Sequence, residues 1–336
     1  MSDNNNFPYE YEKLSPEENK ELMDYMNGFQ MNFIRIGPKG YFFSDYFMTH
    51  APNIYNMEIK SDDVFVATFP KSGTTLMQEL VWLVRNNLDF EKAKAIKLND
   101  RFPFLEESTI APHPPSTDLP ATVDESVIKS LMPMTVDQIK ALPSPRFIKT
   151  HLPMSLLPPN LLDTAKVVYV ARDPRDVAVS FFHHKKLMRV MSQEPEFKPY
   201  WKYFMENKVI WSPYFEHLLE AWGKRNHPNL LFLFYEDLVK DLPSGIRRVA
   251  KFLDKQLTDD EVANLSEHLK FDNFKKNKSV NMEDFQKIGI FRNDGGFVRK
   301  GKSGGWREHF DEEMTAEADE WIKNMLRSTD FRFPHM

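Results

Sequence analysis

Four short apolar runs, each rich in β-branched or aromatic residues, constrain the fold of this chain most. They span residues 64–69, 146–150, 166–171 and 230–235. Runs of this length and composition predict strands that are buried on both faces. The first and third runs lead into segments with helical patterns, over 75–88 and 173–187. A strand followed by a helix, and then repeated, predicts an α/β fold with a central, mainly parallel sheet that helices cover on both faces.

Prolines gather in one segment between the first two runs. Eight of the 23 prolines lie from Pro103 to Pro145, where only short helix-compatible pieces occur. Because long irregular segments inside a compact fold are more often functional than idle, we predict a lid or insertion over a pocket at about 103–145. The C-terminal part has helical patterns at 257–269 and 312–326. No repeat and no linker divides the chain, so we expect a single domain over residues 1–336.

The composition excludes several classes of protein. Lysine and arginine total 44 against 49 acidic residues, so no bulk positive field exists to hold a nucleic acid, and any anion site must be local. The chain has no cysteine, which excludes disulfides, thiolate zinc sites and thiol catalysis. Its first 18 residues are polar and acidic, and no run of 18 apolar residues occurs. We therefore expect a cytoplasmic protein that inserts into no membrane.

The first predicted strand leads directly into a turn that is suited to bind an anion. Residues 69–75 read FPKSGTT and open the next helix, so backbone N–H groups and a helix N-terminus converge there. Lys71 would add a mobile positive charge. The nucleotide P-loop pattern GxxxxGK[ST] is not met, because Lys71 precedes Gly73 instead of following it. The turn favours anion binding and disfavours a P-loop hydrolase, and an ordinary strand-to-helix turn is the alternative.

The second predicted strand ends in a lysine and a histidine. In RFIKTHLP (146–153) the strand period of two places Lys149 and His151 on one side. A lone histidine is more often a structural hydrogen bonder, and a lysine at a strand end is often only solvated. Because both residues lie at the same end of the sheet as the anion-binding turn, we interpret them as a base beside a cation.

The third predicted strand runs directly into Arg172, whose planar guanidinium group can clamp a phosphate. A salt bridge to Asp173 or Asp176 is the alternative. Asp173 is predicted to cap the following helix, whose first residue is Pro174. A Mg²⁺-dependent nucleotide hydrolase would place a carboxylate at this strand end, so the arginine disfavours that class.

These candidates converge on one edge of the predicted sheet. Lys71, His151, Arg172 and Tyr235 all lie at or just after the carboxyl ends of predicted parallel strands. Open α/β sheets bind their ligands at that edge. The glycine-rich basic stretch RKGKSGG at 299–305 is a weak signal alone, but its cations and glycines suit the close approach of an anion. We therefore predict one site at this edge.

Five ordered motifs then point to a family. TFPKSGTT (68–75), KTHLP (149–153), VYVARDPRDVAVS (168–180), FYED (234–237) and RKGKSGGW (299–306) resemble the motif set of cytosolic sulfotransferases, over nearly the whole chain. The resemblance implies a single α/β domain with a P-loop-like phosphosulfate-binding loop. It also implies transfer of the sulfuryl group of 3′-phosphoadenosine 5′-phosphosulfate (PAPS) to a hydroxyl or amine of a small molecule. The product would be adenosine 3′,5′-bisphosphate (PAP), and no metal would be required.

The same resemblance assigns donor-binding positions. The 5′-phosphate would be held by Lys71, Ser72, Gly73, Thr74 and Thr75. The 3′-phosphate would be held by Arg172, Ser180 and Arg299, with help from Lys300 and Gly301. The adenine would lie against Leu76, Tyr235 and Phe271. Most family members carry a tryptophan where this chain has Leu76, and small hydroxyl residues where it has Leu269 and Lys270, so we expect lower nucleotide affinity.

For catalysis, the resemblance makes His151 the general base on the acceptor hydroxyl. Lys71 would stabilise charge on the departing phosphate, and Lys149 would neutralise the sulfuryl oxygens during in-line transfer. Ser180 would restrain Lys71 before the acceptor arrives. Positioning and electrostatics would then supply most of the rate enhancement.

A nearer resemblance is to the insect retinol dehydratase subgroup. It rests on GPKGY (37–41), NIYNM (53–57), NMEDF (281–285), FDEEM (310–314) and the long insertion before KTHLP. Members of this subgroup sulfonate an allylic alcohol and can then eliminate sulfate, which implies a deep lipophilic acceptor pocket. Its lining here would include Tyr46, Phe47 and Phe104, whereas His184 and Glu107 replace two further lining positions and predict a more polar pocket. The family dimer motif KxxxTVxxxE is absent after position 306, so a homodimer stays open but the family interface is not predicted.

Two other functions stay open. A non-catalytic carrier of a lipophile or nucleotide on the same fold is suggested by Leu76, Leu269 and Lys270, and it would bind nucleotide without turnover. A Mg²⁺-dependent small-molecule kinase is disfavoured by the missing carboxylate, and a chelator would distinguish it because only phosphoryl transfer would collapse. We interpret the chain as a PAPS-dependent sulfotransferase that acts on a small hydrophobic alcohol or phenol of retinoid-like, steroid or phenolic type.

Overall fold

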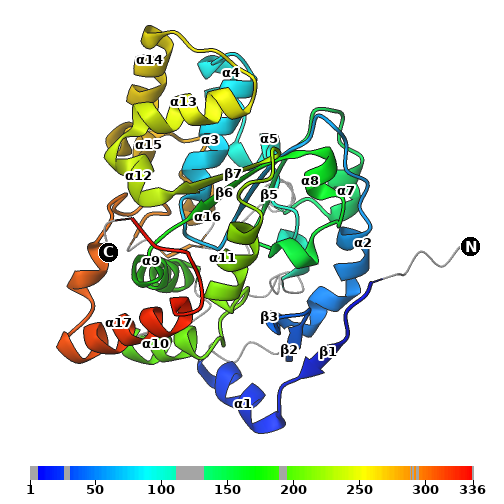
Figure 1. Ribbon diagram of the computed structural model, residues 1–336, viewed down its shortest axis with the longest axis vertical. Coiled ribbons are helices and arrows are strands. Elements are labelled where there is room, and N and C mark those ends of the chain that lie inside the picture. Colours follow the sequence, from blue (N-terminus) through cyan, green and yellow to red (C-terminus); the bar gives the residue numbers. More distant parts are fainter. Residues whose placement is uncertain are drawn as a thin grey trace, which may run out of the picture.

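A parallel sheet of four strands forms the centre of the computed structural model (Figure 1). The model describes residues 7–25, 31–110, 132–188, 195–287, 289, 291–292 and 295–334. The strands are β4 (Val64–Thr68), β5 (Phe147–Thr150), β6 (Lys166–Ala171) and β7 (Leu230–Phe234), in the order β5-β4-β6-β7. All neighbouring pairs are parallel. Each predicted strand is therefore confirmed to within one residue at either end.

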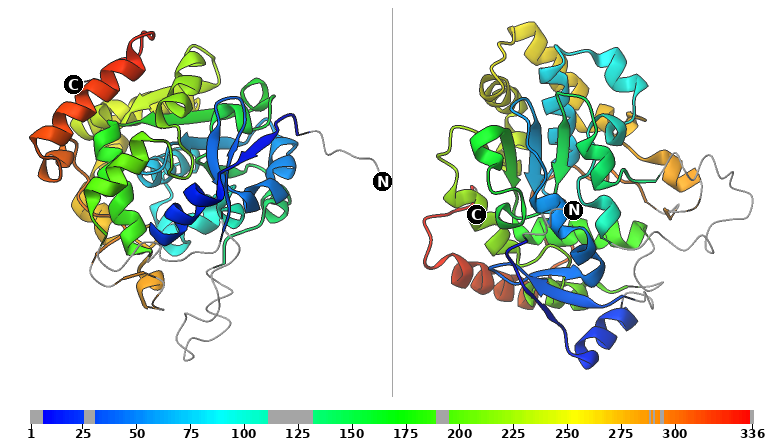
Figure 2. Two further views of the ribbon diagram at one scale, coloured as in Figure 1. Left: turned by 90° about the horizontal axis from the view of Figure 1, so that it is seen from below. Right: turned by 90° about the vertical axis from the view of Figure 1, so that its right-hand side faces the viewer.

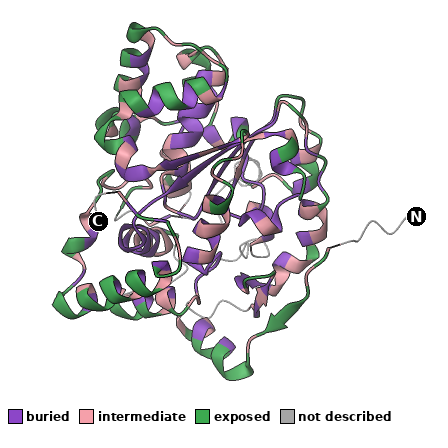
Figure 3. Cartoon of the chain, viewed as in Figure 1, coloured by how far each residue is buried: buried purple, intermediate pink, exposed green. Residues whose placement is uncertain are grey.

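Alternate residues of the strands face two separate apolar clusters. In β4, Val64 and Val66 belong to one cluster, while Phe65 and Ala67 belong to the other. This alternation is what the period of two dictates for a strand that is buried on both faces. The strands accordingly appear as the most uniformly buried part of the chain (Figure 3). The prediction of an α/β fold with helices on both faces of a parallel sheet is confirmed.

The helices divide between the two faces. One face is covered by α3 (Thr74–Arg85), α4 (Phe90–Ala95), α5 (Leu98–Arg101), α12 (Tyr235–Lys240), α13 (Leu242–Phe252), α14 (Asp259–Leu269) and α15 (Phe271–Lys276). The other is covered by α9 (Pro174–Leu187), α10 (Phe197–Met205), α11 (Tyr214–Gly223) and α17 (Glu312–Leu326). Figure 2 shows the yellow helices α13 and α14 and the red helix α17 on opposite sides of the sheet.

A second, antiparallel sheet lies beside the α9 face. It consists of β1 (Tyr11–Lys13), β2 (Phe33–Ile36) and β3 (Tyr41–Ser44), in the order β1-β2-β3. The remaining short elements are α1 (Pro16–Tyr25), α2 (Ala51–Tyr55), α7 (Val136–Lys140), α8 (Leu161–Thr164), α16 (Glu283–Lys287), and the 3₁₀ turns η1 (Asp45–Thr49), η2 (Glu107–Thr109), η4 (Met154–Leu156) and η5 (Gly305–Glu308). The inner residues of β2 and β3 join the same core as α9, so this sheet extends that face of the molecule.

Local signals in the sequence explain where several helices begin. The Asp173 carboxylate accepts a hydrogen bond from the Arg175 backbone and Pro174 follows it, so the predicted cap of α9 is confirmed. Thr135 forms a capping box that starts α7 inside the predicted lid. The helical patterns at 257–269 and 312–326 become α14 and α17. Much of the predicted lid, residues 111–131, lies outside the described residues. In the described part of the chain, no helix is both long and apolar enough to cross a membrane.

The strand register brings the predicted site residues to one edge of the sheet. Ala67 pairs with Thr150, and Ala171 pairs with Phe234, so the four strands end at nearly the same level. The segments that follow them begin with Phe69, His151, Arg172 and Tyr235. This carboxyl edge is where a parallel sheet presents ligands.

Candidate active site

The turn between β4 and α3 has the backbone of an anion cradle. Lys71 and Gly73 both adopt left-handed conformations, with φ of 68° and 104°. A Cβ on Gly73 would lie 2.5 Å from Cδ2 of Tyr235, so only glycine fits there. No side chain caps the N-terminus of α3, and the buried Oγ of Ser72 has no hydrogen-bond partner among the described residues. These unmet donors suit the oxygens of a phosphate group.

Four cations from separate segments surround this cradle. Burial, followed by repulsion from Lys149, Arg172 and Arg299, lowers the pKa of Lys71 to about 7. The Lys71 ammonium lies 4.8 Å from the centre of the Phe297 ring, and no ion pair joins it to an acidic side chain among the described residues. A cluster of cations that repel one another in a buried place gains most from a multivalent anion. The geometry and charge therefore fit a phosphate or phosphosulfate group.

Arg172 ties the cradle to the basic stretch at 299–305. Its two terminal nitrogens donate to the backbone oxygens of Lys71 and Lys302, over 3.0 and 2.9 Å. The guanidinium group stacks 4.3 Å above the Tyr235 ring, and its buried Nε has no hydrogen-bond partner in the described part of the chain. The alternative interpretation of Arg172, a salt bridge, is also met, because the Asp176 carboxylate lies 3.9 Å from Nη2. The Tyr235 ring therefore packs against both Gly73 and the guanidinium group of Arg172.

The basic stretch is fixed by Asp176 and Phe271. The Asp176 carboxylate accepts hydrogen bonds from the backbone N–H groups of Gly304 and Trp306, at 2.6 and 2.9 Å. A Cβ on Gly301 would lie 2.2 Å from the Phe271 ring, so the glycine allows the stretch to cross that ring. Lys300 is engaged with the Glu308 carboxylate. The predicted donor-binding residues thus come together from five segments of the chain: 71–76, 172–180, Tyr235, Phe271 and 299–301.

His151 is held as a neutral imidazole with one nitrogen free. Its Nδ1 lies 2.8 Å from the backbone oxygen of Thr68. Because a carbonyl oxygen can only accept, Nδ1 carries the proton and Nε2 keeps its lone pair. Burial, followed by repulsion from Lys149, lowers the pKa of His151 well below its usual value. The side chain is therefore uncharged at neutral pH and is able to accept a proton at Nε2.

Lys149 and His151 share one aromatic neighbour, as the strand period predicts. The Lys149 ammonium lies 4.1 Å from the centre of the Phe104 ring, and the His151 ring lies 4.9 Å from it. Trp211 contacts both rings, with centroids 5.4 Å from His151 and 6.3 Å from Phe104. Phe181 packs against Trp211 in turn, so Phe104, Trp211 and Phe181 form one apolar wall. An apolar wall next to the free imidazole nitrogen suits a hydrophobic acceptor.

The sequence did not single out Glu106, which organises this region. Its buried carboxylate accepts the His151 backbone N–H at 2.6 Å, the Thr150 hydroxyl at 2.8 Å and the Trp211 indole N–H at 3.2 Å. Burial raises the pKa of Glu106 to about 7, although the donors from His151 and Thr150 oppose that rise. The only signal in the sequence was a pair of acidic residues after an apolar segment, which resembles a solvated surface pair.

The predicted acceptor residues do not all lie at the same depth. Phe104 touches His151 directly, whereas Phe47 stacks on Phe43 at 4.4 Å, and Phe43 in turn contacts Trp211. Tyr46 packs against His50. On the other side, no residue that the structure describes forms a hydrogen bond with the buried Nδ1 of His184, and burial, followed by repulsion from Lys71 and Lys149, lowers the pKa of this histidine. His184 is therefore an uncharged polar group that faces the cationic cluster.

Two further predicted positions have less defined surroundings. Glu107 is half-buried, and burial raises its pKa, against the effect of nearby Lys149. Ser180 is half-buried on α9, two helical turns beyond Asp173, and its hydroxyl makes no hydrogen bond to another described residue. Both side chains are therefore available to a ligand.

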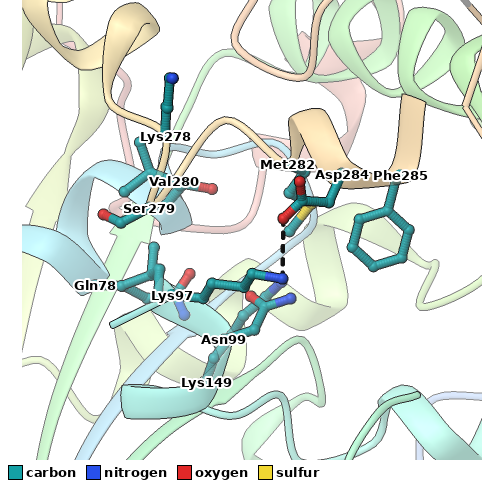
Figure 4. A pocket seen from close by; sticks show the side chains of 12 residues that line it. Gln78, Lys97, Asn99, Lys149, Lys278, Ser279, Val280, Met282, Asp284 and Phe285 are labelled. Carbon is teal, nitrogen blue, oxygen red and sulfur yellow. Dashed lines mark ion pairs between the residues drawn. The ribbon is translucent and has the colours of Figure 1, made fainter. Parts of the chain in front are cut away.

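A small cavity of about 40 Å³ opens next to Lys149 (Figure 4). It lies between the start of α5 and the segment around α16, and Thr75 of the cradle also lines it. The Lys97 ammonium and the Asp284 carboxylate form an ion pair of 2.9 Å across this cavity (Figure 4). The cavity thus connects surface polar residues with Lys149. No group of three metal-ligating side chains converges in the described part of the chain.

A cradle for a multivalent anion beside a neutral histidine, at the carboxyl edge of a parallel sheet, defines an enzyme that transfers a group from an anionic donor. Residues 61–330 match the family model described as "Sulfotransferase domain", so the chain belongs to the sulfotransferase family. The prediction of a PAPS-dependent sulfotransferase is confirmed by this match and by the relatives below.

Relatives and solved structures agree with the family. The chain is 35% identical to luciferin sulfotransferase of Photinus pyralis, over 92% of this chain and 83% of that protein. It is 31% identical to sulfotransferase 1C2 of Homo sapiens, over 83% and 88%. It is 46% identical to retinol dehydratase in complex with androsterone and the inactive cofactor PAP, with a TM-score of 0.92 over 98% of this chain and 99% of that chain. A complex of retinol dehydratase with retinol and PAP superposes with a TM-score of 0.91. The nearer resemblance to the retinol dehydratase subgroup is thereby confirmed.

Proposed function

We propose that this enzyme transfers the sulfuryl group of PAPS to the hydroxyl of a small hydrophobic alcohol or phenol, with His151 as the general base. The observation that carries the proposal is the free Nε2 of a neutral His151 beside the cluster of Lys71, Lys149 and Arg172. A base and an anion site meet there, which is what sulfuryl transfer to a hydroxyl requires.

The donor would be held by the cradle and by the basic stretch. The cradle residues Lys71 to Thr75 fit the 5′-phosphosulfate, because Ser72 and the start of α3 have unmet donors. Arg172, Ser180 and Arg299 are proposed to hold the 3′-phosphate. Bound in this way, PAPS supplies an activated sulfuryl group, while Lys71 and Lys149 neutralise charge that develops during transfer.

The proton of the acceptor hydroxyl would pass to Nε2 of His151. The other proton stays on Nδ1, which donates it to the Thr68 carbonyl oxygen, so the ring does not need to rotate or change tautomer before it acts. The nearby Lys149 disfavours a charged imidazole, which keeps the base unprotonated before the acceptor binds. Its low pKa makes it a weaker base, and transfer therefore relies on proximity and on charge stabilisation as well.

The acceptor would lie on the wall formed by Phe104, Trp211 and Phe181. Retinol dehydratase, which is similar over 98% of this chain, has been crystallised with androsterone and with retinol, and both ligands are lipophilic. His184 and Glu107 add polar groups near that wall, so we propose an acceptor that is more polar than a pure hydrocarbon chain. We also propose that the whole chain acts as one cytoplasmic catalytic domain on small molecules rather than on nucleic acid.

The test is turnover of PAPS that carries a radiolabelled sulfuryl group, in the presence of a chelator, with a panel of phenols, steroids and retinol. We expect label on at least one acceptor, no loss with the chelator, and no transfer by His151→Ala. Transfer that requires Mg²⁺ would contradict the proposal. Binding of PAPS without transfer to any acceptor would favour the carrier interpretation that Leu76 and Lys270 suggest.

A further inference from the structure

A buried histidine on α11 lies directly against the backbone of the proposed base. His217 is fully buried, and its Nε2 lies 2.9 Å from the backbone oxygen of His151. Its Nδ1 lies 2.8 Å from the hydroxyl of Tyr169, which comes from β6. Because a carbonyl oxygen only accepts, Nε2 of His217 donates, and Nδ1 therefore accepts from the tyrosine. The two contacts fix one neutral tautomer of His217.

The backbone of His151 depends on side chains for its hydrogen bonds. His151 follows the last residue of β5, so its peptide groups have left the hydrogen-bonding ladder of the sheet. Its N–H is bound by Glu106, and its carbonyl oxygen is bound by His217. A buried peptide group without a partner costs about 1–3 kcal/mol, so each of these contacts restricts the conformations that the residue can adopt.

The surroundings of His217 keep this contact intact at neutral pH. Burial lowers the pKa of His217 to about 4, so the ring does not gain a second proton in that range. The ring is enclosed by aromatic side chains, with the Phe69 centroid at 5.6 Å and the Tyr41 centroid at 6.5 Å. A neutral ring that is packed on several sides and bonded at both nitrogens has little freedom to move.

We propose that His217, oriented by Tyr169, is a positioning residue for the base: it fixes the peptide of His151 so that Nε2 faces the acceptor. The proposal rests on the proposed role of His151. This arrangement connects three parts of the chain. Tyr169 of β6 orients His217, His217 lies on α11, and His151, just after β5, accepts its hydrogen bond. His217 does not touch the reacting atoms, and its effect on the rate would pass through His151 alone.

Two substitutions of the same residue test the proposal. His217→Leu removes the donor and keeps an apolar side chain, whereas His217→Gln keeps an N–H donor at a similar reach. We expect His217→Leu to lower kcat about 10–100-fold, because small displacements of a catalytic group are costly. We expect the kcat of His217→Gln to stay within about threefold of the wild type, because glutamine keeps the donor and so keeps the His151 peptide in place. The KM for PAPS and the affinity for PAP should be unchanged in both variants.

The rates are expressed per PAP-binding site, so that unfolded protein does not count as lost activity. Tyr169→Phe provides a second variant that keeps the ring but frees the His217 tautomer, and it should lower kcat by a smaller factor. Combined with His217→Leu it should add nothing further, since both changes act through one contact.

Each other outcome has a separate meaning. An unchanged kcat per binding site in His217→Leu would overturn the positioning role while the proposed function stands. A parallel loss of PAP affinity would overturn it too, because the contact would then support the donor site. A wild-type enzyme that transfers no sulfuryl group to any acceptor would instead contradict the proposed function itself.

Discussion

The Nδ1 of His151 lies 2.8 Å from the backbone oxygen of Thr68, and this contact selects the nitrogen that is free to react. Thr68 is the last residue of β4, immediately before the cradle. The orientation of the base is therefore tied to the same strand end that positions the anion-binding turn. The hydroxyl of Thr68 also lies 2.7 Å from that of Thr74 at the start of α3, which strengthens this connection.

Removing the base should stop transfer and leave donor binding intact. We expect His151→Ala to lower kcat by about 10²–10⁴, the usual contribution of a general base. PAP affinity, measured by calorimetry, should change little, because the hydrogen bonds of His151 to described residues go to Thr68, Glu106 and His217 and not to residues 71–75. The matched control is His227→Ala, a half-buried histidine before the amino end of β7, whereas the site lies at the carboxyl end of the strands. Full activity of His151→Ala would exclude His151 as the base.

On a plot of kcat against pH, the fall at low pH (the acid limb) should lie below the usual pKa of histidine. Burial and Lys149 lower the pKa of His151, so the unprotonated, active form persists as the pH falls. We expect the fall in kcat that protonation of His151 causes to lie below pH 6.5, the ordinary histidine value. Lys149→Met should lower kcat and also move the acid limb to higher pH, because a repelling cation is lost. An acid limb at the same pH in Lys149→Met and in the wild type would show that Lys149 does not lower the pKa of His151.

Above neutral pH, the enzyme should take up a proton when it binds the donor. The pKa of Lys71 is about 7 because of burial and three neighbouring cations. At pH 8 most of the free enzyme therefore carries a neutral Lys71, and a bound phosphate favours the charged form and raises that pKa. Calorimetry of PAP binding in two buffers of different ionisation enthalpy should show uptake approaching one proton at pH 8 and little at pH 6. Lys71→Arg should abolish the difference, since arginine stays charged.

Loss of Arg172 should weaken donor binding more than it lowers kcat. Its guanidinium group connects the backbones of Lys71 and Lys302, so its removal loosens two parts of the donor site at once. We expect Arg172→Ala to weaken PAP binding about 10–100-fold, the effect of losing charge-assisted hydrogen bonds. Arg172→Lys should recover only part of this, because lysine lacks the planar fork. If PAP binds Arg172→Ala as tightly as the wild type, the donor lies elsewhere.

An aromatic residue at position 76 should strengthen nucleotide binding. Leu76 is partly buried near the start of α3, beside the cradle. Stacking of an aromatic ring contributes about 0.5–1.5 kcal/mol beyond its buried area, so Leu76→Trp should tighten PAP binding about two- to tenfold. Leu76→Met serves as the control for side-chain size. Equal affinity of Leu76→Trp and the wild type would place the adenine away from this position.

The sequence alone determined the scaffold and grouped most of the residues of the proposed donor site. Strands and their alternation follow from local apolar patterning, and the caps of α9 and α14 follow from single residues such as Asp173 and Thr258. Lys71, His151 and Arg172 could be grouped because parallel strands end at one edge, and their turns are encoded locally. These features depend on neighbours in the chain, which a sequence displays directly.

Only the tertiary structure decided how the base is held and oriented. Glu106 and His217 reach His151 from positions 45 and 66 residues away, and neither has a local pattern that differs from a surface acid or a core histidine. The tautomer of His151 depends on the Thr68 carbonyl, 83 residues away, and the low pKa of Lys71 depends on cations from three other segments. Burial, hydrogen bonding and charge repulsion act through space, so these properties arise only when the folded chain brings distant residues together.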